Sequence, residues 1–239
     1  MPKAAIFDID GTLVDSVDLH ATAWREALQH YGYDIPLADI RHQIGKGGDQ
    51  LLPVFLPDNV LRRQGKEIEE YRSQLFKEKY LSKVRAFPQV RQLFQRLRAD
   101  GLRIPLASSA KGDELATYER IAQIDDLVEA ETSSEDVDRS KPHPDIFQAA
   151  LSRLGSPRVD EVAVVGDSPY DAEAAVRAQL QIIIGVLCGG FPEEELRAAG
   201  CIAVFRDPAH LLRSYDQSPL AQLRTGLHQQ ETVQPTPKR

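Results

Sequence analysis

Short apolar runs, each closing on a small or acidic residue, alternate along most of this chain with segments of helical period. Such continuous apolarity is typical of parallel strands that are buried on both faces of a sheet. The alternation of these strands with helices therefore predicts an α/β fold built on a doubly wound parallel sheet. The predicted strands are residues 4–9, 103–107, 127–131, 162–166 and 180–186.

Segments of helical period lie between these strands, for example residues 90–101 and 145–155. Residues 15–86 break the alternation, because they hold helices at about 17–31 and 58–83 but no convincing strand. We interpret this block as an all-helical cap domain inserted after the first strand. The resulting division is a discontinuous core of residues 1–14 and 87–215, a cap of residues 15–86, and a loosely ordered tail of residues 216–239 that is poor in apolar residues.

Composition limits the partners that we expect. The 239 residues carry 42% hydrophobic and 27% charged side chains, which is ordinary for a chain with a sizeable core. The formal net charge of −7 disfavours nucleic-acid binding through bulk charge, and no apolar run approaches the roughly 18 residues of a membrane-spanning helix. Two cysteines cannot form a disulfide framework, and Asp8 comes too early for a secretory signal. We expect a cytoplasmic monomer or small homo-oligomer, with no nucleic-acid or membrane partner.

The first predicted strand ends in the motif Asp8-Ile9-Asp10-Gly11-Thr12. Strand periodicity places Asp8 and Asp10 on the same side, at the carboxyl end of the strand, where α/β sheets bind ligands. Gly11 allows the chain to turn sharply there. Neighbouring carboxylates repel each other, so a cation or a shared proton has to relieve them. The alternative is an acidic turn in which one aspartate caps a helix.

Polar residues also follow two later predicted strands, and another lies in the loop between these strands. The hydroxyl and N–H groups of Ser108 and Ser109 could hold an anion above a helix N-terminus, or serve only as a helix cap. Lys141 is kept in an extended loop by the proline that follows it, although a loop lysine is usually a solvated charge. Asp167 and Asp171 lie one helical turn apart, and each could also be a cap.

These residues are expected to act together, because the predicted topology brings all of them to one rim of the sheet. Ser108 and Lys141 offer a hydroxyl and an ammonium group to a phosphoryl group bound there. An oxygen-rich cluster suited to a hard cation such as Mg²⁺ would be formed by Asp8, Asp10, Asp167 and Asp171.

The order of these motifs (DxDGT, a serine after a strand, Lys-Pro, then GDSxxxD-like acids) resembles the haloacid dehalogenase superfamily. It is most similar to the capped phosphohydrolases of the phosphoglycolate phosphatase and β-phosphoglucomutase branch. The resemblance extends over nearly the whole chain to about residue 215. It implies a Rossmann-like core with a helical cap, and a phosphatase that depends on Mg²⁺ and acts on a small phosphorylated metabolite.

The resemblance also implies roles for individual residues. Asp8 would be the nucleophile that forms an aspartyl-phosphate, and Asp10 would be the general acid and base, with its backbone carbonyl on Mg²⁺. Asp167 would ligate the metal, and Asp171 would either ligate it or support that site. The groups that bind the phosphoryl group would be Gly11, Thr12, Ser108, Ser109 and Lys141.

Substrate choice is expected to come from the cap. His20 and Trp24 lie one helical turn apart, and they resemble a histidine and an aromatic residue of the mutase branch. His20 could hydrogen-bond Asp10 or a substrate hydroxyl, or both residues could only pack the cap hinge. Lys46, in the segment Gly45-Lys46-Gly47-Gly48, could meet a second anionic group of the substrate. The glycines could equally serve only to turn the chain between helices.

The sequence departs from the mutases in two places. It has no Ser-Arg pair near Lys46, and the fourth motif is Gly166-Asp167 with Asp171 instead of a Glu-Asp pair. Both departures favour hydrolysis, for example of 2-phosphoglycolate or of sugar or polyol phosphates. Dehalogenation is disfavoured by Asp10, and imine chemistry on Lys46, as in phosphonoacetaldehyde hydrolase, by its Gly-rich loop. The alternatives are a β-phosphoglucomutase-like sugar-phosphate mutase and a non-catalytic phosphate-binding regulator.

Overall fold

The computed structural model describes residues 3–110, 112–133 and 136–223. A sheet of six parallel strands in the order β5-β4-β1-β6-β7-β8 forms the centre of the fold. This topology confirms the predicted doubly wound α/β sheet. The strands are β1 (Ala4–Phe7), β4 (Pro105–Ala107), β5 (Ala130–Thr132), β6 (Val162–Gly166), β7 (Ile182–Val186) and β8 (Ala203–Phe205).

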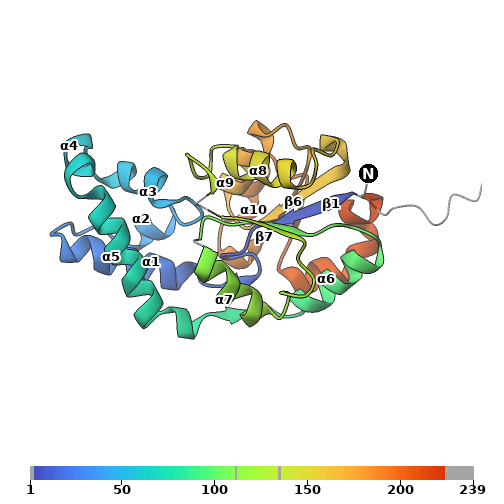
Figure 1. Ribbon diagram of the computed structural model, residues 1–239, viewed down its shortest axis with the longest axis horizontal. Coiled ribbons are helices and arrows are strands. Elements are labelled where there is room, and N and C mark those ends of the chain that lie inside the picture. Colours follow the sequence, from blue (N-terminus) through green and yellow to red (C-terminus); the bar gives the residue numbers. More distant parts are fainter. Residues whose placement is uncertain (1–2, 111, 134–135, 224–239) are drawn as a thin grey trace, which may run out of the picture.

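Helices cover both faces of this sheet (Figure 1). Strand β1 shows why, because its buried side chains alternate between two apolar clusters: Ala5 and Phe7 enter one, Ala4 and Ile6 the other. On one side the ring of Phe7 lies 4.9 Å from that of Phe94, between ring centroids. That face is covered by α6 (Val90–Ala99), α7 (Gly112–Ala122) and α11 (Pro208–Arg213), and the other by α8 (Asp145–Arg153), α9 (Pro169–Arg177) and α10 (Glu193–Ala199).

The helical block that we interpret as the cap lies beyond one end of the sheet (Figure 1). It has its own apolar cluster, in which Trp24 and Leu28 pack with Ile40, Leu51 and Ile68. A two-residue antiparallel pair, β2 (Val14–Asp15) with β3 (Arg85–Ala86), joins the segments by which the chain leaves and re-enters the core. The helices of the block are α1 (Val17–His30), α2 (Leu37–Arg41), α3 (Gly48–Phe55), α4 (Asp58–Val60) and α5 (Lys66–Lys79).

Several predicted boundaries were wrong. The strand predicted at 127–131 starts later, at Ala130, because the N–H groups of Leu127 and Val128 bond to the carbonyl of Ile124 in a turn. Strand β8 was missed because only three residues form it. The prediction that 15–86 holds no strand overlooked the short pair β2 and β3.

The helix predicted at 58–83 is not continuous. A π-helical turn at Leu61–Gly65 separates α4 from α5, which ends at Lys79 before a 3₁₀ turn at Leu81–Lys83. The tail was predicted to begin at residue 216, but Pro219–Leu223 forms a further 3₁₀ segment, and its Leu220 and Leu223 are buried in the core. The rest of the predicted tail, residues 224–239, lies outside the described residues.

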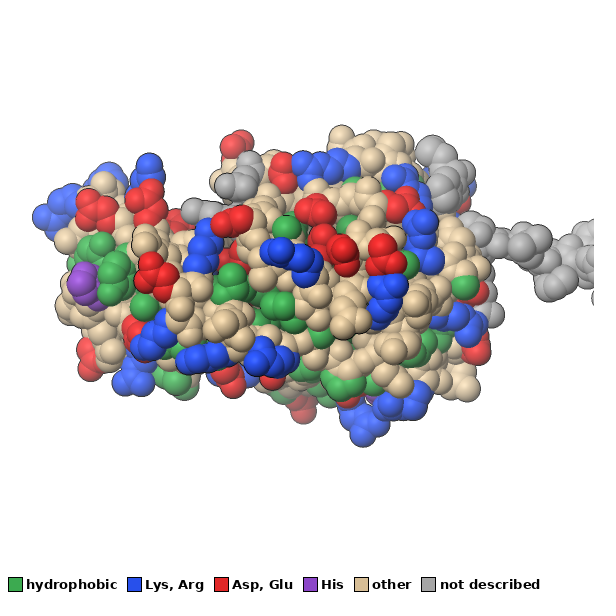
Figure 2. Space-filling view, turned by 60° about the horizontal axis from the view of Figure 1, so that its bottom comes forward, with side chains coloured by type: hydrophobic (Ala, Val, Ile, Leu, Met, Phe, Trp, Pro, Cys, Tyr) green, Lys and Arg blue, Asp and Glu red, His purple; other side chains and the backbone are tan. Residues whose placement is uncertain are grey.

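Surface charges are mixed on the face shown in Figure 2, where acidic and basic side chains are interspersed. Some of them pair across elements, as Lys77 of α5 does with Asp113 of α7 at 2.6 Å. Within the described part of the chain, no helix is both long and apolar enough to cross a membrane.

Candidate active site

Two aspartates meet where neighbouring strands end. Strands β1 and β6 are parallel and in register, so Asp8 and Asp167, the residues that follow them, lie side by side. Asp171, in the first turn of α9, joins them. The three residues are 2–5% exposed, and one carboxylate oxygen of each lies within 4.8 Å of the others. The topology thus brings three of the predicted aspartates together.

Asp171 is held by the start of its own helix. One of its carboxylate oxygens accepts hydrogen bonds from the Ser168 N–H at 3.1 Å and from the Ser168 hydroxyl at 2.6 Å, and Ser168 is the N-cap of α9. The other oxygen lies 2.7 Å from Nζ of Lys141. Asp171 therefore caps the helix and faces the site at the same time.

Lys141 is a buried residue and not a solvated loop charge, because its side chain is only 1% exposed. Its Nζ contacts a carboxylate oxygen of Asp8 and donates to the carbonyl of Ala107 at 3.1 Å. Burial alone lowers the pKa of a lysine, but here the carboxylates of Asp171 and Asp8 outweigh it and raise the pKa of Lys141 above its ordinary value. The ammonium group is therefore a permanent positive charge between two carboxylates.

Negative charge in this cluster exceeds positive charge. Burial raises the pKa of Asp8 to about 7, against the opposing effect of Lys141. Burial and the neighbouring carboxylates raise the pKa of Asp167 as well. The hydroxyl of Thr12 lies 3.1 Å from an oxygen of each, yet it has one proton to donate. Three carboxylates against one ammonium group leave an excess of negative charge, so the cluster calls for protons or a cation.

The donor set fits a hard cation, because it consists of carboxylate oxygens around one small space. The chain also approaches this space closely at Gly11, which turns with a φ of +80°. A Cβ atom there would lie 2.3 Å from a carboxylate oxygen of Asp167, so only glycine fits. Gly11 thus makes the turn that was expected of it.

Asp10 points away from this cluster. One of its carboxylate oxygens lies 2.9 Å from Nε2 of His20 and accepts a hydrogen bond from the hydroxyl of Ser16. Burial raises the pKa of Asp10, but His20 and Ser16 together lower it by more, so the net shift of the pKa is downward. Strand periodicity led us to expect all four carboxylates together. The backbone of Asp8 still bonds to Val165 of β6, and the chain turns from Ile9 onward. The Asp10 carboxylate lies outside the three-carboxylate cluster found among the described residues.

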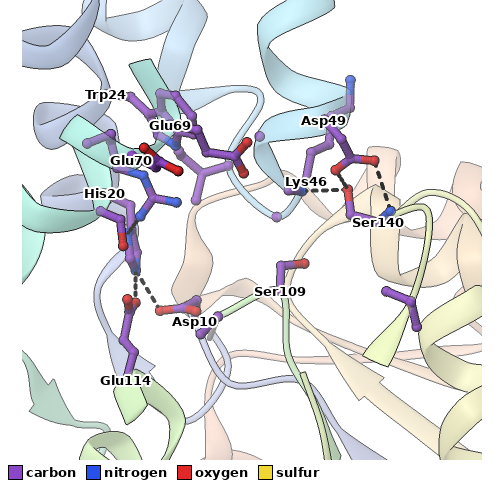
Figure 3. Close-up of a pocket in the computed structure, with 18 of the residues that line it drawn as sticks. Asp10, His20, Trp24, Lys46, Asp49, Glu69, Glu70, Ser109, Glu114 and Ser140 are labelled. Carbon is purple, nitrogen blue, oxygen red and sulfur yellow. Dashed lines mark hydrogen bonds and ion pairs between the residues drawn. The ribbon is translucent and has the colours of Figure 1, made fainter. Parts of the chain in front are cut away.

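A cavity of about 390 Å³ lies between the sheet and the helical block. In Figure 3, Asp10 and Ser109 lie on its core side, and Trp24, Glu69 and Glu70 on its cap side. Ser109 lines the cavity, whereas Ser108 is fully buried, and its hydroxyl oxygen accepts a hydrogen bond from the Ala110 N–H at 3.0 Å.

His20 joins the two sides of the cavity. Its ring stacks on Phe76 of α5, with ring centroids 3.9 Å apart, and the nitrogen that faces Asp10 also lies 3.0 Å from the hydroxyl of Tyr118. That hydroxyl donates to Glu114 at 2.7 Å. His20 therefore contacts Asp10, as the sequence suggested, and also packs on Phe76; its contact with a substrate hydroxyl stays a prediction.

Lys46 lies at the edge of the cavity. Its Nζ donates to Gln43 at 2.6 Å and lies 4.5 Å from the ring centroid of Tyr170, in the first turn of α9. Burial lowers the pKa of Lys46, against the opposing effect of Glu173. The structure thus gives Lys46 protein partners of its own.

The loop that starts α3 docks directly beside Lys141. The N–H of Gly47 donates to the hydroxyl oxygen of Ser140 at 2.9 Å, and the carboxylate of Asp49 accepts from the Ser140 N–H at 3.1 Å and from its hydroxyl (Figure 3). A Cβ atom on Gly47 would lie 2.6 Å from Cβ of Ser140. The block and the Lys141 loop therefore form one wall.

Sequence reasoning missed five residues of this region. Asp49 and Ser140 adjoin the segments that the motifs singled out, so their proximity to Lys46 and Lys141 was the available signal. No signal distinguished the remaining three from other polar helix residues: Arg72, Glu114 and Tyr118.

Comparison with known proteins agrees with this architecture. Residues 5–184 match the family model described as haloacid dehalogenase-like hydrolase. The solved structure of a hydrolase from Pseudomonas syringae superposes with a TM-score of 0.82 at 31% identity, covering 90% of this chain and 98% of that one. The phosphoglycolate phosphatase of Nitrosospira multiformis is 31% identical over 183 residues, 72% of this chain and 78% of the relative. The phosphorylated carbohydrates phosphatase of Thermotoga maritima is 26% identical over 212 residues, 85% and 94% of the two chains. The chain belongs to the haloacid dehalogenase-like hydrolase family.

Proposed function

We propose that the protein is a Mg²⁺-dependent phosphatase that hydrolyses a small organophosphate monoester through an aspartyl-phosphate on Asp8. The observation that carries this proposal is the separation of two carboxylates. Asp8 is held at the floor of the cavity by Lys141, and Asp10 is held apart by His20. Phosphatases among the relatives, including one for phosphorylated carbohydrates, support the same substrate class.

In the first step, a carboxylate oxygen of Asp8 attacks phosphorus and the ester P–O bond breaks. Because the pKa of Asp10 is lowered, Asp10 passes on a proton that the imidazole of His20, 2.9 Å away, supplies to it, and the leaving alkoxide receives that proton. In the second step, Asp10 takes a proton from water, the water oxygen attacks the phosphoryl group on Asp8, and inorganic phosphate leaves. Lys141 offsets the repulsion between two anionic reactants throughout. Ser109 lines the cavity, and its hydroxyl would bind a phosphoryl oxygen.

The metal would be held by Asp8 and Asp167, with Asp171 as a further ligand or as support, and by the backbone carbonyl of Asp10. When bound, Mg²⁺ supplies positive charge to the phosphoryl oxygens. The chain itself fixes its ligands through Thr12 and through the cap of α9. We also propose that residues 15–86 act as the cap that excludes water and contacts the leaving group.

The proposal is tested by phosphate release from a panel of phosphomonoesters, with Mg²⁺ and with EDTA. The panel contains 2-phosphoglycolate, hexose and pentose phosphates, and glycerol phosphates. We expect release that requires the metal and is concentrated on few compounds. Release in EDTA equal to that in Mg²⁺ would refute metal dependence. No release by the folded protein would refute the phosphatase, and formation of an isomeric sugar phosphate would establish the mutase instead.

Magnesium affinity is expected to rise with pH. The raised pKa values of Asp8, about 7, and of Asp167 mean that binding must displace protons from the cluster. Because the cation binds the deprotonated carboxylates, the dissociation constant should fall roughly tenfold per pH unit below pH 7, for one proton displaced, and then level off. Calorimetric titration in two buffers of different ionisation enthalpy measures both the affinity and the proton release. An affinity that is constant from pH 5 to 8 would contradict this prediction.

A further inference from the structure

Arg72 of α5 lines the cap side of the cavity, close to the acid that would protonate the leaving group. Its guanidinium lies over the ring of Trp24, 4.7 Å from the ring centroid. One of its terminal nitrogens lies 3.4 Å from Nδ1 of His20, and the other ring nitrogen of His20 lies 2.9 Å from Asp10. A single imidazole ring therefore separates the Arg72 cation from Asp10.

Within the described parts of the chain, no neighbouring carboxylate compensates the charge of Arg72. Among the described residues, none places a carboxylate oxygen within 4.0 Å of this guanidinium, and its Nε is buried without a hydrogen-bond acceptor. Two further cations among the described residues that line the cavity have side-chain partners: Nζ of Lys46 donates to Gln43, and Nζ of Lys66 lies 3.7 Å from Glu70. Because Arg72 lines the cavity, an anion bound there could pair with its guanidinium charge.

The acidic residues of the cavity restrict where an anion can lie. Glu69 and Glu70 line the cap side as well (Figure 3), and the carboxylate of Asp49 is bonded to Ser140. Like charges repel, so a negative group on the substrate is disfavoured beside the glutamates. Beside Arg72 it gains a fixed, planar set of donors that matches a carboxylate or phosphate.

We propose that Arg72 determines substrate specificity by binding an oxyanion carried by the leaving group, a carboxylate or a second phosphate. The inference rests on the proposed phosphatase function. It also gives to Arg72 the role that the sequence suggested for Lys46. Because Arg72 lies one ring away from Asp10, this anionic group lies within a few bonds of the ester oxygen that Asp10 protonates.

The test compares kcat/KM on esters that differ only in the distal group. One pair is 2-phosphoglycolate and 2-hydroxyethyl phosphate; the other is propane-1,3-diol bisphosphate and 3-hydroxypropyl phosphate. For at least one pair, kcat/KM of the wild type should be tenfold or more higher on the ester that carries the distal anionic group. A preference within the first pair indicates a carboxylate, and a preference within the second pair indicates a second phosphate. Arg72→Met keeps the aliphatic stem and should lower kcat/KM on that member about 10- to 100-fold, mainly through KM, so that the preference disappears. Arg72→Lys should restore part of it.

Lys46→Met is the matched control and should retain the preference. The inference is overturned if Arg72→Met lowers kcat/KM equally on both esters of a pair. That result would mean that Arg72 only supports His20. It is also overturned if Lys46→Met removes the preference, or if the wild type turns over both members alike. Turnover of the esters that lack the distal anionic group measures the phosphatase activity independently of Arg72. If these esters are hydrolysed, a negative result for Arg72 refutes only the specificity proposal. If the wild type hydrolyses none of the four esters, the proposed function itself is refuted.

Discussion

Asp8→Asn is expected to lower kcat by roughly a thousandfold or more, because an amide cannot form the phospho-enzyme. The substitution changes the side-chain volume little, and Lys141 keeps its contact with Asp171. It also removes one carboxylate from a crowded, buried group, so the thermal midpoint of the metal-free variant should not fall. Steady-state phosphate release and thermal unfolding measure the two effects.

Asp125→Asn, at an exposed position between α7 and β5, is the matched control and should leave turnover unchanged. If Asp8→Asn retained turnover within tenfold of the wild type while still folded, Asp8 would not be the nucleophile. Trapping of phosphate on the wild-type protein but not on the variant would give independent support.

Lys141→Met is expected to abolish turnover and to destabilise the metal-free protein by about 3–5 kcal/mol near pH 8. The loss arises because Asp8 and Asp171 would stay buried without their shared positive charge. The pKa of Asp8 is already raised to about 7 and would rise further, so protonation neutralises it as the pH falls. The destabilisation should therefore be smaller at pH 5 than at pH 8, as measured by urea unfolding.

Lys77→Met provides the comparison, because Lys77 pairs with Asp113 at the surface, where both side chains are at least one-third exposed. Its loss should cost no more than about 1 kcal/mol. Equal stability of Lys141→Met and wild type at pH 8 would mean that the cluster does not need the ammonium group.

The rim that carries Asp8 and Asp167 was predictable from the sequence because topology alone determines it. Parallel strands bring their carboxyl ends to one edge, so Asp8 and Asp167 had to be neighbours once β1 and β6 were recognised. The direction of the Asp10 side chain was not predictable. It depends on the turn that follows β1 and on hydrogen bonds to His20 and Ser16, which tertiary packing brings into reach.

The cap wall was less predictable. Lys46 was singled out because glycines surround it, whereas Arg72 lies in a charged helix with few apolar residues and no local signal. Only the packing of α5 against α1 brings its guanidinium onto Trp24. Boundaries failed for a similar reason: three-residue strands such as β5 and β8 are defined by their partners and not by their own composition.

The docking of the α3 loop on Ser140 has a consequence for how such an enzyme diversifies. The seal between the block and the core uses a backbone N–H and a space where Gly47 has no side chain, together with Asp49. The part of the cavity wall that carries Arg72, the residue proposed to meet the leaving group, belongs to a different element, α5. Substitutions on α5 can therefore change the preferred leaving group while the contact of Gly47 and Asp49 with Ser140 stays unchanged. Enzymes that share one reaction but act on different substrates can then arise by altering a single helix.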